Sequence, residues 1–206
     1  MAEPPRHLVV MARAPRLGTV KRRLARDLGD LAALRFYRGL TAALLADLGR
    51  DPRWTTWLAV TPDAAARDPR GLWGFGGPVL AQGPGDLGRR MGRILTRLPP
   101  GPAVIVGSDI PGITRRGVFA AFHSLGANDW VFGPAEDGGY WLVGARRRPA
   151  LRLPFAGVRW STGEALADTL ANLAGCKVGF AERLADVDGG ADYRRLYAAA
   201  SSRTGR

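Results

Sequence analysis

The chain has 206 residues, 46% hydrophobic and 23% charged, which suffices for a buried core and excludes a wholly disordered protein. Its 30 lysine and arginine residues against 18 acidic ones give a formal net charge of +12, which favours phosphate-bearing partners. One cysteine excludes an internal disulfide framework. No apolar run reaches membrane-spanning length and no secretory pattern begins the chain, so we expect a cytoplasmic protein.

The basic charge is spread along the chain rather than concentrated on one helix. Only Lys21 and Lys177 are lysines, so nearly all of it is arginine. A coding bias toward arginine explains this skew as well as a functional reason does. No helix-turn-helix, zinc-finger or aromatic RNA-binding signature accompanies the charge. A small anionic substrate is therefore favoured over nucleic acid.

Apolar runs alternate with segments of helical period. Strands are predicted at residues 7–12, 57–61, 78–82, 103–107, 130–133, 140–144 and 177–181. Helices are predicted at residues 20–28, 30–48, 86–98, 114–125, 161–173 and 192–200. Because the strands lack a period of two, we predict a three-layer α/β protein with a mostly parallel sheet covered on both faces. We expect one domain over residues 1–200 and a loose tail at 201–206.

The turn after the first predicted strand breaks a local rule. Lys21, Arg22 and Arg23 open the following helix, where positive charges oppose the helix dipole. An anion on the free amides, flanked by Arg13 and Lys21, would resolve the conflict. A solvated basic face is the alternative. The paired Gly-Lys-Ser/Thr ending of a Walker A loop is absent.

Three carboxylates are candidates for a metal site. Asp109 follows a buried strand, at the edge where open parallel sheets bind ligands, although an aspartate there also forms turns. Asp186 and Asp188 share one side of an extended chain and repel each other unless a cation joins them. With Asp109 they would offer Mg²⁺ three oxygen ligands. An exposed acidic turn before the last helix is the alternative for the later pair.

A glycine-rich turn separates two predicted strands. Asp137, Gly138 and Gly139 read as a hairpin turn. Glycines also let a substrate approach the backbone closely, with Tyr140 nearby for packing. Both interpretations stay open.

A second candidate for substrate contact lies at the start of a predicted helix. Ser161 and Glu164 have the spacing of a capping box, so helix capping is the favoured role of Ser161. A capped helix start also attracts anions, so Thr162 would be placed to touch a phosphate or carboxylate.

Six motifs in a fixed order carry a resemblance to a known family. They are Arg-Ala-Pro-x-x-Gly-x-Val-Lys-x-Arg-Leu at 13–24, Gln-x-x-x-Asp-Leu-Gly-x-Arg-Met at 82–91, Gly-Ser-Asp-Ile-Pro at 107–111, Gly-Pro-Ala-x-Asp-Gly-Gly-Tyr at 133–140, Trp-Ser-Thr at 160–162 and Asp-Val-Asp at 186–188. The chain resembles a bacterial glycosyltransferase-A-like family labelled arsenosugar-biosynthesis glycosyltransferase or domain of unknown function. Its relatives include the molybdenum-cofactor and phospholactate guanylyltransferases.

The resemblance implies a nucleotide-diphospho-sugar transferase fold and a role for each motif. The loop with Ala12, Arg13, Gly18 and Lys21 would lie over the nucleotide phosphates. The residues that would approach the base are Gln82, Leu87 and Gly88. The acceptor would face Asp137, Gly138, Gly139, Tyr140, Ser161 and Thr162. Arg13 stands where the family more often has lysine, and Arg22 where it more often has threonine.

The leading hypothesis is a Mg²⁺- or Mn²⁺-dependent transferase that uses a nucleotide donor and a small-molecule acceptor. Asp109, Asp186 and Asp188 would hold the metal, and Lys21 with Asp109 would be catalytic, with Lys21 and Arg13 stabilising charge on the leaving group. In a nucleotidyl version an acceptor phosphate attacks the α-phosphorus. In a glycosyl version an acceptor hydroxyl attacks the anomeric carbon. A non-catalytic nucleotide-binding module is the alternative, and a nucleic-acid binder ranks below it.

Overall fold

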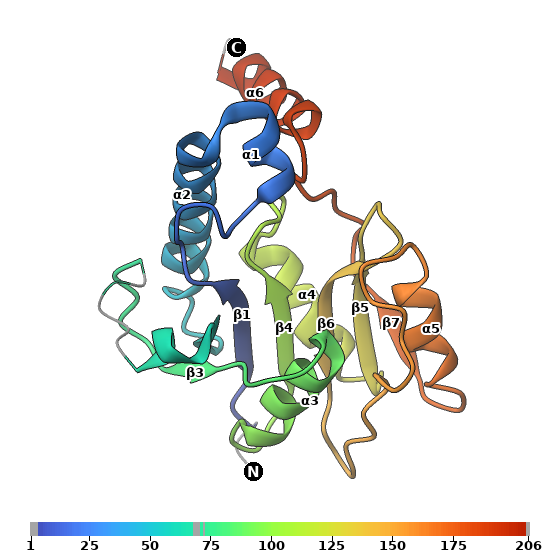
Figure 1. The fold of residues 1–206 in the computed structure, drawn as a ribbon. Helices are drawn as coiled ribbons and strands as arrows, with labels where there is room; N and C mark the ends of the chain where they lie inside the picture. The colour runs from blue at the N-terminus through green and yellow to red at the C-terminus, as the bar shows by residue number, and fades with distance from the viewer. Residues whose placement is uncertain (1–3, 68–70, 72, 205–206) are drawn as a thin grey trace.

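The chain forms one seven-stranded sheet in the order β3-β2-β1-β4-β6-β5-β7 (Figure 1), in a computed structural model that describes residues 4–67, 71 and 73–204. Its strands are β1 (His7–Arg13), β2 (Thr55–Thr61), β3 (Val79–Ala81), β4 (Ala103–Gly107), β5 (Trp130–Pro134), β6 (Tyr140–Ala145) and β7 (Val178–Phe180). β6 runs antiparallel to both of its neighbours, and the other pairs are parallel. The predicted mostly parallel α/β sheet is therefore confirmed.

Helices cover both faces of this sheet. They are α1 (Arg22–Leu28), α2 (Asp30–Leu48), α3 (Leu87–Arg97), α4 (Arg115–Ser124), α5 (Ala165–Ala171) and α6 (Gly190–Thr204), with a 3-10 turn η1 (Asp63–Ala66). α1 and α6 contact each other beyond the carboxyl ends of β1 and β4 (Figure 1). Among the described residues, no helix is both long and apolar enough to cross a membrane.

The first strand shows why its sequence lacks an alternating pattern. Leu8 and Val10 belong to the core beneath α2 and α4, whereas Val9 belongs to the core beneath α3. All three side chains are fully buried. Because both faces are covered, consecutive positions such as these three gain from being apolar, by about 2 kcal/mol for a side chain of this size.

Helix α5 begins later than the sequence predicts. It starts at Ala165 instead of Ser161, and Ser161 has a left-handed backbone with φ 61°. The capping-box prediction is therefore wrong, since neither Ser161 nor Glu164 caps the helix with its side chain. The physical reason is tertiary: the Gly138 carbonyl of the β5–β6 hairpin accepts the Leu166 N–H at 3.1 Å.

Helix α6 is longer at both ends than the sequence predicts. It begins at Gly190, and the Asp192 carboxylate in its first turn accepts the backbone N–H groups of Asp188 and Gly189 at 3.1 and 2.9 Å. It continues through Thr204, so four residues of the expected loose tail are helical. Residues 1–3, 68–70, 72 and 205–206 lie outside the described part of the chain.

Candidate functional site

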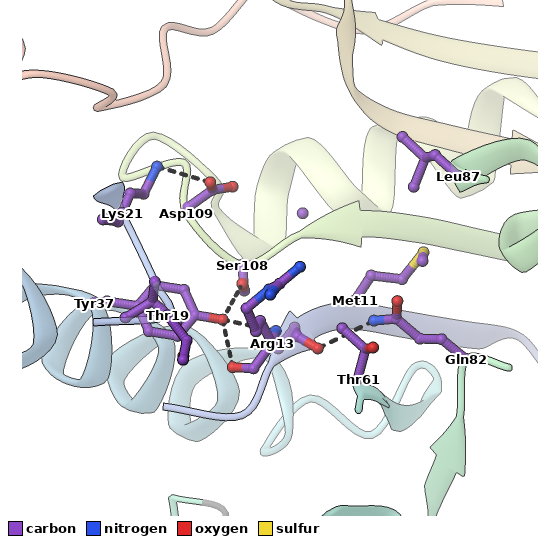
Figure 2. Close-up of a pocket in the computed structure, with 13 residues that line it drawn as sticks. Met11, Arg13, Thr19, Lys21, Tyr37, Thr61, Gln82, Leu87, Ser108 and Asp109 are labelled. Atoms are coloured by element: carbon purple, nitrogen blue, oxygen red, sulfur yellow. Dashed lines mark hydrogen bonds and ion pairs between the residues drawn. The ribbon is translucent and has the colours of Figure 1, made fainter. Parts of the chain in front are cut away.

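A cavity of about 300 Å³ opens at the carboxyl ends of β1, β2 and β4 (Figure 2). We call it the β1 cavity; it is lined by Met11, Ala12, Arg13, Thr19, Val20, Lys21, Tyr37, Thr61, Gln82, Leu87, Gly107, Ser108 and Asp109. Most of the residues predicted to hold the donor therefore surround one space. This is the edge of the sheet where open α/β folds bind ligands.

Lys21 is the central cation of the β1 cavity. It ends the loop after β1 with a left-handed backbone (φ 46°, ψ 50°), rare for a residue with a side chain. Its Nζ donates to Asp109 Oδ2 at 2.7 Å and lies 3.6 Å from Asp188 Oδ1. The side chain is only 5% exposed. A strained backbone thus aims a buried ammonium between two carboxylates.

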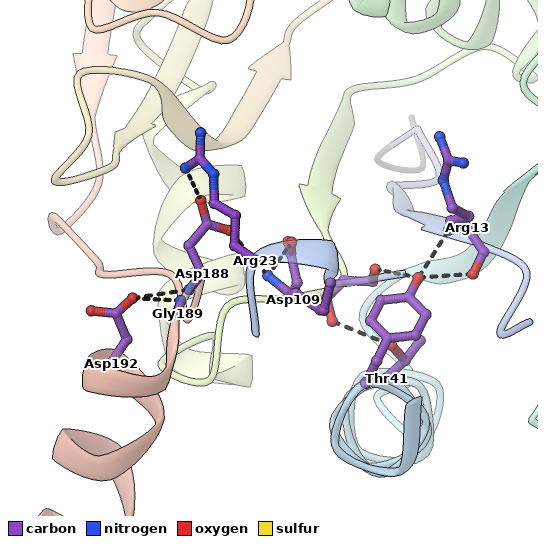
Figure 3. A network of polar contacts seen from close by, with 10 residues as sticks. Arg13, Arg23, Thr41, Asp109, Asp188, Gly189 and Asp192 are labelled. Carbon is purple, nitrogen blue, oxygen red and sulfur yellow. Dashed lines mark hydrogen bonds and ion pairs between the residues drawn. The ribbon is translucent and has the colours of Figure 1, made fainter. Parts of the chain in front are cut away.

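The contacts of Lys21 extend into a longer polar network (Figure 3). Asp188 also accepts a hydrogen bond from Arg23 Nη1 at 2.9 Å. Because Asp109 follows β4 and Asp188 precedes α6, the ion pairs of Lys21 with these two carboxylates tie the loop after β1 to two distant parts of the chain. The sequence singles out Lys21, Asp109 and Asp188 as site residues. It does not predict that Arg23 pairs with Asp188.

Other carboxylates surround Asp186, which is also a predicted metal ligand. Burial and then the neighbouring Asp188 carboxylate raise the pKa of Asp186 to about 6. Lys21 opposes this rise, whereas Asp137 and Asp109 add to it. Such mutual repulsion is relieved by a cation. In residues 4–67, 71 and 73–204, however, no three acidic, histidine or cysteine side chains are grouped closely enough to hold a metal ion, so the metal role of Asp109, Asp186 and Asp188 stays a prediction.

Tyr37 is a site residue that the sequence analysis missed. Its hydroxyl donates to the Arg13 carbonyl at 2.8 Å, accepts the Arg13 N–H at 2.9 Å and lies 3.2 Å from Ser108 Oγ. Burial raises its pKa. Thr41, one turn further along α2, donates to the Ser108 carbonyl at 3.4 Å. The helical period marks Tyr37 as inward-facing, but does not say that its hydroxyl holds two loops together.

Gln82 is placed in the β1 cavity with its amide nitrogen already in use. Nε2 donates to the carbonyls of Ala12 at 3.0 Å and Ala59 at 2.9 Å. The side chain is buried and joins the ends of β1 and β2. Its amide nitrogen has no further hydrogen to offer a nucleotide base, which leaves Oε1, 3.5 Å from Arg90 Nη1, as the atom that could contact a ligand.

Gly18 and Gly88 do not line the β1 cavity, although the resemblance places both at the nucleotide. Gly18 has φ +72° in the loop before α1, a turn conformation that favours glycine. A side chain at Gly88 would lie 2.7 Å from atoms of both Phe155 and Trp160. Gly88 therefore allows α3 to pack closely against this segment.

A second cavity, of about 380 Å³, adjoins the first one beside the β5–β6 hairpin. We call it the hairpin cavity; it is lined by Leu87, Gly107, Asp109, Ile110, Ala135, Asp137, Gly139, Tyr140, Trp141, Trp160, Ser161, Thr162, Ala165 and Asp186. The two cavities share Leu87, Gly107 and Asp109. Five of the six residues predicted to face the acceptor are among its lining residues.

The sixth, Gly138, is not among the lining residues, and it makes a close contact of its own. Its φ is +82°, and a Cβ there would lie 2.1 Å from the Gly163 carbonyl oxygen. Only glycine allows the hairpin and the segment before α5 to approach this closely. This contact places Ser161 and Thr162 against the cavity.

Aromatic side chains form one wall of the hairpin cavity. The rings of Tyr140 and Trp160 meet edge to face with centroids 6.3 Å apart. Trp141 is buried and its indole donates to the Glu182 carbonyl at 3.0 Å. Burial holds the pKa of Tyr140 well above its usual range, so this phenol stays neutral. The Trp-Ser-Thr motif assigns no role to Trp160, whose ring forms part of this wall.

Together, the sheet order and the two adjoining cavities define an α/β protein of the nucleotide-diphospho-sugar transferase type. A bacterial family described as "Uncharacterized protein conserved in bacteria (DUF2064)" matches residues 44–162. The chain belongs to this family, in agreement with the glycosyltransferase-A-like resemblance of its motifs. No curated protein matches the sequence.

Solved structures agree with this fold. A "putative nucleotide-diphospho-sugar transferase" from Desulfovibrio desulfuricans G20 is 29% identical with a TM-score of 0.87, over 93% of this chain and 86% of the other. 4-Diphosphocytidyl-2C-methyl-D-erythritol synthase from Anaerococcus prevotii is 10% identical, TM-score 0.56, over 96% and 98% of the chains. Glucosyl-3-phosphoglycerate synthase from Mycobacterium tuberculosis, with Mn²⁺, UDP and glucosyl-3-phosphoglycerate, is 12% identical, TM-score 0.54, over 98% and 80%.

Proposed function

We propose that this protein is a metal-dependent transferase that binds a nucleotide donor in the β1 cavity and a small acceptor in the hairpin cavity. One observation carries the proposal: the two cavities adjoin and share Asp109. A group transferred between two ligands has to cross a common boundary, and this one lies at the carboxyl ends of the strands.

The β1 cavity suits a diphosphate. Arg13 and Lys21 supply positive charge from opposite sides of one loop, and charged hydrogen bonds to phosphate are the strong ones. The similarity to a nucleotide-diphospho-sugar transferase and to a synthase solved with UDP supports this choice of ligand. Met11 and Leu87 offer apolar surface for the rest of the nucleotide.

The carboxylates beside the cavity suit a hard divalent cation. The ammonium of Lys21 already lies within 4 Å of both Asp109 and Asp188, so this position attracts positive charge. Asp109, Asp186 and Asp188, which are not grouped closely enough to share an ion in the free protein, would have to draw together to hold Mg²⁺ or Mn²⁺ through carboxylate oxygens. The metal would neutralise phosphate charge and favour departure of the leaving group.

In this proposal Lys21 pairs with carboxylates in the free protein and with donor phosphates in the complex. In the free protein it neutralises Asp109 and Asp188. Once a cation takes over the carboxylates, Lys21 becomes available to the donor phosphates and stabilises the charge that develops on them. Tyr37 fixes the backbone of Arg13 on the other side of the loop, so that both cations keep a defined spacing.

The test is a thermal-shift panel of nucleoside triphosphates and nucleotide-sugars, each with and without Mg²⁺. We expect one class to stabilise the protein only with the metal, because a ligand stabilises the state that binds it. Asp109→Asn should remove this metal dependence. Asp47→Asn is the matched control, since Asp47 pairs with Arg115 away from both cavities.

The outcomes separate the possible roles. If no nucleotide stabilises the protein under either condition, the proposal is wrong. If a nucleotide binds but no group is transferred to a broad acceptor panel, the protein is a non-catalytic nucleotide-binding module.

A further inference from the structure

The charge of the hairpin cavity is opposite to that of the chain. The chain has 30 basic residues against 18 acidic ones, yet Asp109, Asp137 and Asp186 line this cavity. No lysine, arginine or histidine is among its described lining residues. In a chain so rich in arginine, a cavity of this size with three carboxylates and no cation is unexpected from composition alone.

The cations around the cavity are engaged elsewhere. Lys21 donates to Asp109 from the side of the β1 cavity. Arg159 forms paired hydrogen bonds with Asp168 at 2.9 and 2.8 Å. Arg183 Nη1 donates to the Ala135 carbonyl at 3.4 Å. None of these three side chains lines the space that an acceptor would fill.

The remaining walls offer apolar faces and hydroxyl groups. Tyr140 and Trp160 provide aromatic surface, and Ser161 and Thr162 lie at the rim. Asp137 Oδ1 accepts the Gly139 N–H at 2.9 Å, which fixes the orientation of its carboxylate. Ionised carboxylates accept hydrogen bonds from hydroxyl or amine groups and repel anions.

We infer that the hairpin cavity takes an acceptor without negative charge that reacts through a hydroxyl group. This inference rests on the proposed function and selects its glycosyl form. Even when Lys21 and a divalent cation balance Asp109 and Asp186, an acceptor phosphate would meet the Asp137 carboxylate and no lysine, arginine or histidine among the described lining residues. A sugar or polyol would find hydrogen-bond acceptors and an aromatic face.

The step balances without a further reactant. The acceptor oxygen forms a bond to the anomeric carbon of a nucleotide-sugar. The bond between that carbon and the diphosphate oxygen breaks, and the nucleoside diphosphate leaves with the electron pair. The hydroxyl proton passes to the carboxylate of Asp137, which lines the cavity.

The charge of the cavity is tested first, without any acceptor. Fluorescence quenching of Trp160, isolated as the difference between the native protein and Trp160→Phe, is measured with iodide, caesium and neutral acrylamide at fixed ionic strength, and each quenching constant is divided by its value for free N-acetyltryptophanamide. We expect a larger quenching constant for caesium than for iodide, after the acrylamide value has been used to correct for the accessibility of the ring. Asp137→Lys should raise iodide quenching by about twofold or more through local charge, and Asp47→Lys should not. Iodide quenching that equals or exceeds that of caesium in the native protein would overturn the inference.

The second arm uses matched acceptors. With the nucleotide-sugar that binds best, transfer to glycerol and glucose is compared with transfer to glycerol 3-phosphate and glucose 6-phosphate. We expect the phosphorylated partner of each pair to react at least about tenfold more slowly, because like charges disfavour its binding. Faster transfer to the phosphorylated compounds would overturn the inference. If no nucleotide binds at all, the proposed function fails, while the quenching result still decides the character of the cavity.

Discussion

The two adjoining cavities differ in how the chain builds them and in the charge they present. The β1 cavity lies where parallel strands end, and two cations, Arg13 and Lys21, face one carboxylate, Asp109. The hairpin cavity lies beside the antiparallel strand β6, and Asp109 is one of its three carboxylates. The comparison shows that a single shared aspartate lies between a space lined by two cations and a space lined by three carboxylates.

The largest expected effect tests the cationic side of this comparison. Lys21→Ala should weaken binding of a nucleoside diphosphate by about 100-fold, since a charged hydrogen bond to phosphate is lost. The parent nucleoside should lose much less. Calorimetric titration of both ligands measures the difference. Lys177→Ala, which changes the chain's other lysine at an exposed position, is the control. Equal losses for nucleoside and diphosphate would exclude a contact between Lys21 and phosphate.

The next effect tests the construction of the acidic side. Gly138→Ala should destabilise the protein by about 2 kcal/mol more than Gly157→Ala, because overpacking adds to the cost of a left-handed backbone. Both glycines have positive φ, but only Gly138 faces a close neighbour, the Gly163 carbonyl. Urea denaturation gives the two free energies of unfolding. If they match, the contact between the hairpin and Gly163 is not what requires glycine.

A third substitution compares the hydroxyl groups of the two cavities. Tyr37→Phe leaves the Arg13 N–H and carbonyl without their partner, and should cost about 1 kcal/mol or more of unfolding free energy. Tyr140→Phe should cost less, since the Tyr140 hydroxyl makes no hydrogen bond of normal geometry among the described residues. Thermal denaturation of both variants measures the order, and the reverse order would contradict this account of Tyr37.

The smallest expected effect concerns His7, which is not among the described lining residues of either cavity and therefore reports fold stability separately from ligand binding. Burial lowers the pKa of His7, so the unfolded chain takes up a proton first as the pH falls through 6.5. The free energy of unfolding should therefore decrease below that pH. His7→Gln should remove this part of the pH dependence, measured by urea denaturation from pH 8 to 5. An unchanged profile would mean that another group is responsible.

Much of the fold was predictable because local signals agreed with the final structure. The buried strand before Asp109 and the helix capped by Asp86, whose Oδ1 accepts the Arg89 N–H at 2.8 Å, lie where the sequence places them. The capping-box prediction at Ser161 failed because a carbonyl from a distant hairpin took over the helix start. Local pattern cannot reveal such a competitor.

The candidate site was predictable to a similar extent. Charges at strand ends indicated Lys21 and Asp109, which the structure brings to 2.7 Å. The roles of Tyr37 and Trp160 were not predicted. A helical period or a short motif identifies an aromatic residue but does not indicate which loop its side chain contacts. Gln82 was expected near the base. The sequence did not reveal that its amide nitrogen donates both of its hydrogens to the backbone carbonyls of Ala12 and Ala59.

In the ion pair between Lys21 and Asp109, a side chain of the protein itself serves as the counter-ion of the carboxylate. Acidic active sites often need a bound metal to keep their loops from separating, and chelators then loosen them. Here the chain itself balances the charge at the rim, so treatment with EDTA should leave the folded state intact. Storage without ligand should then be no threat to the protein, and a metal that binds as proposed would displace the ammonium of Lys21 from the carboxylates rather than complete the fold.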